Sequence, residues 1–228
     1  MRKVEKFIVL DTETANTTQD ALTYDVGFIV ADRHGNIYEQ HSYCIYDVFV
    51  NEQDLMQSAY YSKKIPLYYQ GLANNEYKLI QFNTVRKIIA DTIKKYNITK
   101  IFAYNCYFDK VALTTTQRYL TKSKYRWFFP YDVEFHDIWN FACSTICQQK
   151  GYKDFCEQNN YISNRGRNYQ SKAEQVYQYI TKQNDFIELH QGLADVLIEY
   201  DILLRCYATH KKVETSINRG CWNKVKRV

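Results

Sequence analysis

The sequence predicts an α/β fold in which helices flank a mixed sheet. Three observations support this prediction: strand-like segments separated by turns fill the first 45 residues, a helical period starts at Phe82, and a short apolar run follows that helix. Consecutive strands joined by short turns pair antiparallel, whereas a strand that follows a helix favours parallel pairing with an earlier strand. A chain of 228 residues is long enough for one full-sized domain with a substantial core.

The first strand runs directly into acidic residues. Residues 7–14, Phe-Ile-Val-Leu-Asp-Thr-Glu-Thr, place four apolar side chains before two carboxylates. On an extended strand, Asp11 and Glu13 project from the same face. Two carboxylates in one small volume repel each other unless a cation neutralises them, and hard oxygen ligands suit Mg²⁺ or Mn²⁺. An isolated Asp-x-Glu is more often a strand that enters an acidic turn, so a site needs partners elsewhere.

The next segments predict a three-stranded antiparallel meander. Residues 24–30 and 37–45 are strand-like, and the turn 32–36, Asp-Arg-His-Gly-Asn, separates them. Residues 47–80 give weaker signals, and Pro66 interrupts any helix there. We expect irregular helix and loop in that stretch.

A helix and a second core strand follow. Residues 82–96 carry apolar side chains at helical spacing, and Asn97 is a typical helix stop. Residues 100–104 then form a short apolar strand, and the segment 105–109 after it ends in Asp109. A third acid thus leaves the end of a core strand, where side chains converge in open α/β sheets.

A histidine among carboxylates precedes the next predicted helix. Residues 132–137 read Asp-Val-Glu-Phe-His-Asp, and the helix is predicted at 138–147. His136 and Asp137 are adjacent, so on a strand they point to opposite faces. We therefore expect a structural or helix-capping role for them rather than a metal site.

The stretch 148–185 is the least regular part of the sequence. It begins with polar residues, and its segment 164–168, Asn-Arg-Gly-Arg-Asn, is a basic exposed loop that is either solvated or in contact with phosphates. A helix with apolar residues at helical spacing begins near Ala173.

The last predicted helix is amphipathic and is preceded by a histidine. His190 comes five residues before Asp195, which corresponds to about 140° around a helix. Both residues can serve one site only if His190 lies at or before the helix start while Asp195 points inward from the first turns. Gly192 permits such a start. Alone, this pair is weak evidence for a site.

Charge, cysteine content and hydropathy further limit the partners and the cellular compartment that we expect. The chain has 30 Lys and Arg against 25 Asp and Glu, a net charge of +5, which is compatible with a polyanionic partner but does not demonstrate one. Seven cysteines without a CxxC pair, and no secretory signal, predict reduced thiols in the cytoplasm and no structural zinc. No apolar run approaches the ~18 residues needed to span a bilayer, so we expect no membrane partner.

Basic residues are concentrated near the C-terminus. Six lysines and arginines follow Thr209, against Glu214 as the single acid. We therefore divide the chain into a domain at 1–210 and a basic extension at 211–228.

Three of these motifs together resemble those of the DEDDh 3′-to-5′ exonucleases, which include proofreading subunits of bacterial replicases, RNase T-like enzymes and small phage exonucleases. The motifs are Asp11-x-Glu13, Asn105-x-x-Phe108-Asp109 and His190-x4-Asp195. They occur in the family's order between residues 7 and 207. The DEDDy relatives have a Tyr four residues before the last Asp, where this chain has Gln191.

The resemblance implies a ribonuclease H-like fold with a mixed five-stranded sheet. It implies cleavage of phosphodiester bonds at the 3′ end of single-stranded nucleic acid, DNA favoured over RNA, with two divalent cations, Mg²⁺ or Mn²⁺. The expected metal ligands are Asp11, Glu13, Asp109 and Asp195. His190 is the expected general base, because an imidazole titrates near neutrality. A polymerase or another replication protein is a candidate partner.

The resemblance also implies contacts to the terminal nucleotide from the backbone at Thr14 and Ala15 and from Asn105 and Phe108. The long stretch between Asp137 and His190 bears on substrate choice. Two alternatives are an RNA-trimming exoribonuclease and a catalytically silent nucleic-acid-binding adaptor on the same fold. Four clustered carboxylates argue against the adaptor, because they would repel phosphate.

Overall fold

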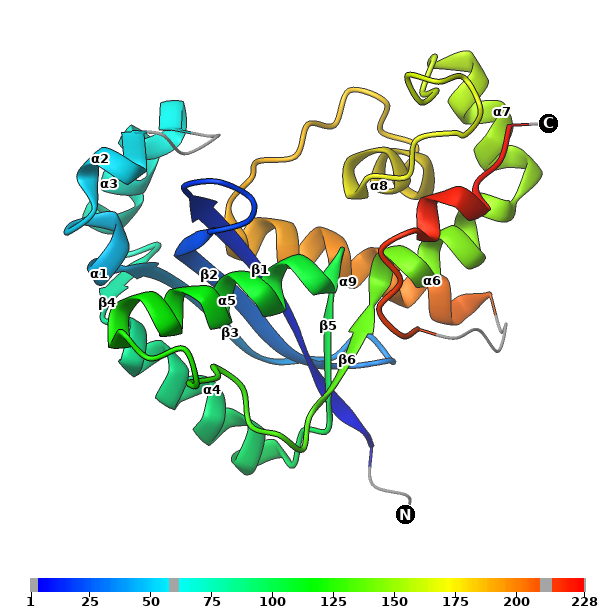
Figure 1. The fold of residues 1–228 in the computed structure, drawn as a ribbon. Coiled ribbons are helices and arrows are strands. Elements are labelled where there is room, and N and C mark those ends of the chain that lie inside the picture. Colours follow the sequence, from blue (N-terminus) through cyan, green and yellow to red (C-terminus); the bar gives the residue numbers. More distant parts are fainter. Residues whose placement is uncertain (1–3, 58–61, 210–214, 228) are drawn as a thin grey trace.

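The computed structural model describes residues 4–57, 62–209 and 215–227. Across these residues the chain folds around one mixed six-stranded sheet in the order β4-β3-β2-β1-β5-β6 (Figure 1). The strands are β1 (Lys6–Ala15), β2 (Leu22–Asp32), β3 (Ile37–Ile45), β4 (Lys78–Ile80), β5 (Lys100–Ala103) and β6 (Glu134–Asp137). The predicted α/β class is confirmed, whereas the sheet has six strands in place of the expected five.

The pairing of β1, β2, β3 and β5 follows the predicted pattern. β1 pairs antiparallel with β2, and β2 pairs antiparallel with β3, which confirms the meander. β5 lies parallel to β1, with Ile8 opposite Ile101 and Val9 opposite Phe102. β4 is parallel to β3 and β6 is parallel to β5. The carboxyl ends of β1 and β5 therefore lie at the same edge of the sheet.

Helices cover both faces of the sheet (Figure 1). Within the described residues they are α1 (Tyr46–Phe49), α2 (Gln53–Gln57), α3 (Ile65–Ala73), α4 (Phe82–Tyr96), α5 (Cys106–Thr121), α6 (Ile138–Ser144), α7 (Lys150–Gln158), α8 (Ala173–Thr181) and α9 (Gly192–Ala208), with 3-10 turns at Ser62–Lys64, Ile146–Gln148 and Cys221–Lys224. α4 has the predicted bounds, and Asn97 ends it in the left-handed conformation.

Sequence reasoning missed α5, α7 and β4. The buried face of α5 consists largely of small or polar side chains, so it shows no apolar stripe. α7 is short and buries two of its residues, Tyr152 and Cys156. β4 is three residues long at the edge of the sheet, too short for a visible alternation.

The two faces of β1 contribute to two separate cores. Ile8 and Leu10 belong to the core beneath α4, whereas Phe7 and Val9 belong to the core beneath α6 and α9. Alternate side chains of a strand point to opposite faces, so a strand covered on both faces has a continuous apolar sequence. This double burial explains the apolar run that precedes the first two acids.

The histidine and acid at 136 and 137 have structural roles, as expected. Asp137 accepts hydrogen bonds from Trp139 N at 2.9 Å and from Asn140 N at 3.4 Å, and so it caps α6. His136 Nδ1 lies 2.7 Å from Thr215 Oγ1. This contact ties β6 to the C-terminal segment.

The described part of the predicted basic extension packs against the rest of the protein. In residues 215–227, Cys221 and Val225 are fully buried in the core beneath α6 and α9. Lys211 and Lys212 lie outside the described residues. The segment 215–227 is thus held by apolar burial despite its basic composition.

All seven cysteines are free and buried. They act as small core side chains. No helix in the described ranges is long and apolar enough to cross a membrane.

Candidate active site

Acidic side chains converge where the parallel strands β1 and β5 end. Continuing the register of these strands places Asp11 beside the end of β5. Asp109 lies in the first turn of α5, which directly follows β5, and Asp195 lies in the first turn of α9. The fold therefore gathers acids from three distant parts of the sequence.

A cavity of about 260 Å³ lies at this edge of the sheet. It is lined by Asp11, Glu13, Tyr104, Asn105, Trp139, Lys172, Ala173, Glu188, His190, Asp195 and Glu199. Four of the five predicted catalytic residues line it. The fifth, Asp109, is bonded to Thr12, the residue between the two acids of β1.

Asp109 is fixed to β1 by two hydrogen bonds. Thr12 donates to its Oδ1 from the backbone N at 3.1 Å and from Oγ1 at 2.8 Å. Both residues are buried. The start of α5 is thus joined to β1, the strand that carries Asp11 and Glu13. These two hydrogen bonds hold the three carboxylates at fixed positions relative to one another.

The start of α9 places the remaining two residues. Gln191 N donates to Asp195 Oδ2 at 3.0 Å, and Asp195 N donates to Gln191 O at 3.0 Å. His190 precedes the helix and has a left-handed backbone, with φ of 53°. This is the arrangement that the sequence required for both residues to face one site.

Two glycines bring α9 against the sheet. A Cβ atom at Gly27 of β2 would lie 2.1 Å from the carbonyl carbon of Gly192, and one at Gly192 would lie 2.6 Å from Gly27 N. Gly192 N donates to Asp25 Oδ2 at 2.9 Å, and Tyr68 OH donates to the same oxygen at 2.7 Å. The backbone of α9 therefore approaches β2 more closely than any side chain would allow.

Burial raises the pKa of the clustered carboxyl groups. Burial and then repulsion from Asp195 raise the pKa of Glu13 to about 9. Burial first, followed by a neighbouring acid, raises the pKa of Asp195 to about 8, and burial raises that of Asp109 to about 7. The pKa of Asp11 is also raised, by burial and then by repulsion from the surrounding acids. Such a cluster retains protons near neutral pH unless a cation replaces them.

The donor atoms of the cluster fit a divalent cation. Asp11 Oδ2 and Asp195 Oδ1 are buried and accept no hydrogen bond from the described residues. Glu13, His190 and Asp195 each offer one ligand atom, and these atoms lie within 4.8 Å of one another. Unpartnered buried oxygens in an acidic cluster suit a hard cation such as Mg²⁺ or Mn²⁺.

His190 combines partial burial with an acidic neighbour. Its side chain is 27% exposed, and its Nδ1 lies 3.8 Å from Glu188 Oε2. Burial and then the charge of Lys64 lower the pKa of His190. Lys64 Nζ also donates to Leu189 O, which ties the segment before the histidine to the 3-10 turn at Ser62–Lys64. The lowered pKa favours the neutral imidazole, the form that can accept a proton.

The four residues predicted to contact the terminal nucleotide do not all line this cavity. Among the described residues that line the cavity, Asn105 is the single member of that set. Thr14 follows an irregularity in the register of β1 and is half-buried, whereas Ala15 is fully buried. Phe108 is half-buried in the first turn of α5. The roles assigned to these four residues stay predictions.

Sequence reasoning missed two acids of the cavity. Glu199 is 3% exposed and accepts a hydrogen bond from Tyr104 N at 3.0 Å. It lies four residues after Asp195, so helical spacing could have identified it. Glu188 lies two residues before His190 in a loop, where no periodicity marks it. Burial and then repulsion from Glu174 raise the pKa of Glu188 to about 7.

The fold resembles solved structures, although the chain matches no protein-family model and no curated protein sequence. One similar structure is that of E. coli exonuclease I in complex with a dA16 oligonucleotide. It has 16% sequence identity and a TM-score of 0.55, and the match covers 90% of this chain and 41% of that chain. A product-bound structure of exonuclease I has 15% identity and a TM-score of 0.54 over 91% of this chain and 44% of that one.

A third similar structure is that of the cell-death related nuclease CRN-4. It has 9% identity and a TM-score of 0.52 over 90% of this chain and 64% of that chain. At such identities the likeness establishes the fold. This chain spans 41 to 64% of the length of the three chains.

Proposed function

We propose that this protein is a metal-dependent nuclease that releases nucleotides from the 3′ end of single-stranded nucleic acid, with DNA favoured over RNA. The observation that carries the proposal is one cavity that combines buried carboxylates, unpartnered oxygens and a histidine. The order of the sequence motifs and the likeness to exonuclease I bound to an oligonucleotide support the polarity and the substrate class.

The four predicted acids, Asp11, Glu13, Asp109 and Asp195, would hold two divalent cations. When bound, the cations would neutralise phosphate charge and lower the pKa of a water molecule. The acids could then stay ionised in their buried setting, because the cations would offset their mutual repulsion.

His190 would take the proton from the attacking water. The water oxygen bonds to phosphorus while the bond from phosphorus to the 3′ oxygen of the preceding nucleotide breaks, and that oxygen leaves with a proton from solvent. Glu188, 3.8 Å from His190 Nδ1, would stabilise the imidazolium that forms. The lowered pKa favours the unprotonated form of His190 before the step.

The test uses labelled single strands of DNA and RNA with free 3′-hydroxyl groups, in Mg²⁺, in Mn²⁺ or in EDTA. Cleavage should require a metal, and Asp109→Asn should largely abolish it together with the metal-induced rise in Tm. Asp91→Asn is the matched control, because Asp91 is exposed on α4. Full activity of Asp109→Asn would refute the metal-site assignment, and binding without cleavage by the native protein would favour the adaptor.

Polarity has its own test. A 3′-phosphorylated strand and a circular strand should both resist cleavage, because the proposed reaction starts from a free 3′ end. If the circular strand were cut as fast as the linear one, the protein would be an endonuclease.

A further inference from the structure

A second cavity, of about 650 Å³, lies between the loop 163–168 and the C-terminal segment. We call it the basic cavity, and it is lined by Ser163, Asn164, Arg165, Arg167, Asn168, Trp222, Asn223 and Lys226. Among the described residues, its lining contains three cationic side chains and no carboxylate. Two basic segments that are far apart in the sequence therefore form one surface.

Backbone pairing holds the two segments together. Tyr169 N donates to Val225 O at 2.9 Å, and Arg227 N donates to Arg167 O at 3.0 Å. Arg227 itself forms two bonds to Glu157, at 2.7 Å and 3.0 Å. In Figure 1 the C-terminal segment accordingly lies beside α7. The cavity is thus part of the ordered fold.

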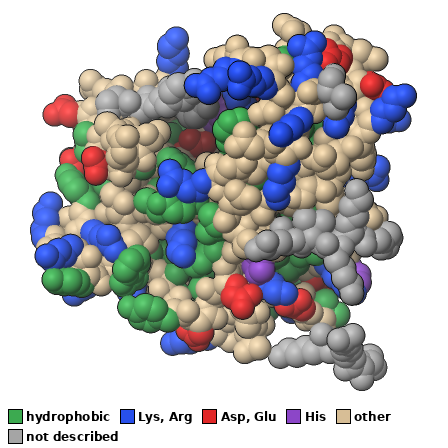
Figure 2. Space-filling model, turned by 45° about the vertical axis from the view of Figure 1, so that its right-hand side comes forward, with side chains coloured by type: hydrophobic (Ala, Val, Ile, Leu, Met, Phe, Trp, Pro, Cys, Tyr) green, Lys and Arg blue, Asp and Glu red, His purple; other side chains and the backbone are tan. Residues whose placement is uncertain are grey.

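The cationic side chains of the basic cavity are available to a ligand. Arg165, Arg167 and Lys226 are exposed, and the ion pairs found among the described residues do not involve them. Trp222 is 41% exposed, which leaves ring surface for stacking. Lys and Arg side chains also predominate over acidic ones in the upper half of the face shown in Figure 2.

The basic cavity is joined to the active site by a short segment. Asn168 lines the basic cavity, and Lys172 lines the active-site cavity. Four residues span at most about 14 Å. Ser171 within this segment accepts from Tyr104 OH at 2.6 Å through its backbone O and from Trp139 Nε1 at 2.9 Å through Oγ. The two cavities therefore have a fixed separation at this point.

We propose that the basic cavity binds single-stranded nucleic acid upstream of the 3′ end that is held in the active site. Arg165, Arg167 and Lys226 would contact phosphates, and Trp222 would stack on a base, the combination that sequence-tolerant single-strand binders use. Asn164 and Asn223 supply amide groups for base edges. The identity of this ligand rests on the proposed function.

The test measures binding by fluorescence anisotropy in EDTA, which separates binding from cleavage. The probe is a fluorescein-labelled thymidine strand of about 15 nucleotides, long enough to span both cavities. Arg165→Ala/Arg167→Ala should weaken binding and flatten the plot of log K against log salt by roughly 1.4, for two lost phosphate contacts. The control, Lys87→Ala/Lys94→Ala, removes equal charge from exposed positions on α4 and should leave the slope nearly unchanged.

Trp222→Ala tests the stacking contact. It should weaken binding by about 5- to 100-fold without changing the salt slope, because stacking releases no counterions. Equal losses in the two double variants, or native affinity and slope in Arg165→Ala/Arg167→Ala, would overturn the inference. If the basic cavity binds the probe but no strand is cleaved in Mg²⁺ or Mn²⁺, the proposed nuclease function fails and the binding site stands.

Discussion

His190 distinguishes the candidate active-site cavity from an ordinary acidic pocket. One ring nitrogen of His190 lies within 4.8 Å of a carboxylate oxygen of Glu13 and of Asp195, so it is placed to be a further metal ligand. Its lowered pKa also suits a general base. These two roles respond differently to removal of the imidazole. A ligand contributes to metal affinity, whereas a base contributes to turnover.

We predict that His190→Ala lowers turnover by ~10²- to 10⁴-fold and leaves metal-induced stabilisation nearly intact. Turnover on a labelled single strand and Tm with and without Mn²⁺ are the measurements. His34→Ala is the control, because His34 is exposed in the turn between β2 and β3. Loss of the metal response would identify His190 as a ligand, and normal turnover would exclude both roles.

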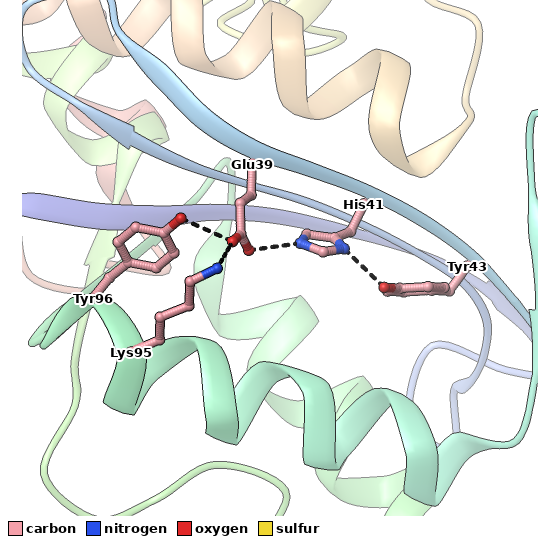
Figure 3. A network of polar contacts seen from close by, with 5 residues as sticks. All are labelled: Glu39, His41, Tyr43, Lys95 and Tyr96. Carbon is pink, nitrogen blue, oxygen red and sulfur yellow. Dashed lines mark hydrogen bonds and ion pairs between the residues drawn. The ribbon is translucent and has the colours of Figure 1, made fainter.

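At another point, the charged side chain of Glu39 joins β3 to α4. Glu39 accepts hydrogen bonds from Lys95 and from Tyr96 OH, the latter at 2.8 Å, and its Oε2 lies 3.1 Å from His41 Nε2 (Figure 3). Burial acts to raise the pKa of Glu39, but these hydrogen bonds outweigh it and lower the pKa from 4.5 to about 2. The ionised form of Glu39 therefore stabilises the fold.

Because this pKa is lowered on folding, the stabilisation is present above the unfolded pKa near 4.5 and is lost as the pH falls through about 2. We predict that Glu39→Gln lowers Tm at neutral pH by up to about 4 °C, the range for a partly exposed ion pair. The difference from the native protein should shrink in thermal melts as the pH falls from 4.5 to about 2. A constant difference across that window would contradict the assignment.

At the element scale, the contact between α9 and β2 determines where His190 and Asp195 lie. Gly27 and Gly192 meet backbone to backbone, and Asp25 binds the first N–H group of the helix. Any side chain at this contact must displace the helix start. Both proposed catalytic residues would move with it.

We predict that Gly192→Ala lowers turnover by ~10²-fold, the effect of a displacement of about 1 Å at a reacting group. Its Cβ would lie 2.6 Å from Gly27 N and 3.0 Å from Asp25 Oδ1. Gly220→Ala is the matched control, since its Cβ would meet nothing closer than 3.5 Å. Equal turnover of the two variants, measured at a temperature where both are folded, would show that the close approach does not position the site.

At the scale of the whole molecule, the acid cluster couples stability to metal and pH. Carboxyl groups with a raised pKa retain protons in the folded state that the unfolded chain releases, so their contribution is favourable below the unfolded pKa near ~4 and is lost as the pH rises through the folded values. Those values are about 7 for Asp109, about 8 for Asp195 and about 9 for Glu13.

We predict that the metal-free protein loses stability as the pH rises from ~5 to ~9, and that Mg²⁺ or Mn²⁺ restores it. At saturating metal the rise in Tm should reach about 5 to 10 °C near pH 9 and vanish near pH 5, where protons occupy the acids. Thermal melts in EDTA and in each metal provide the measurement. A metal effect of the same size at both pH values would place the cation elsewhere.

The sequence by itself determined the meander, the helix at 82–96 and the parallel strand after it, because each has a local period or turn signal. It also identified Asp11, Glu13, His190 and Asp195, which line the cavity, and Asp109, which is bonded to Thr12 between the first two acids. Their catalytic roles remain predictions.

Only the tertiary structure decided which other side chains line the two cavities and which further elements form. Glu188 has no local pattern, β4 is too short to show one, and α5 buries small polar residues where a helix usually shows an apolar stripe. The basic cavity joins the loop 163–168 to Trp222 and Lys226 through backbone pairing. Contacts of this kind depend on register and packing between distant segments, and local periodicity carries no information about them.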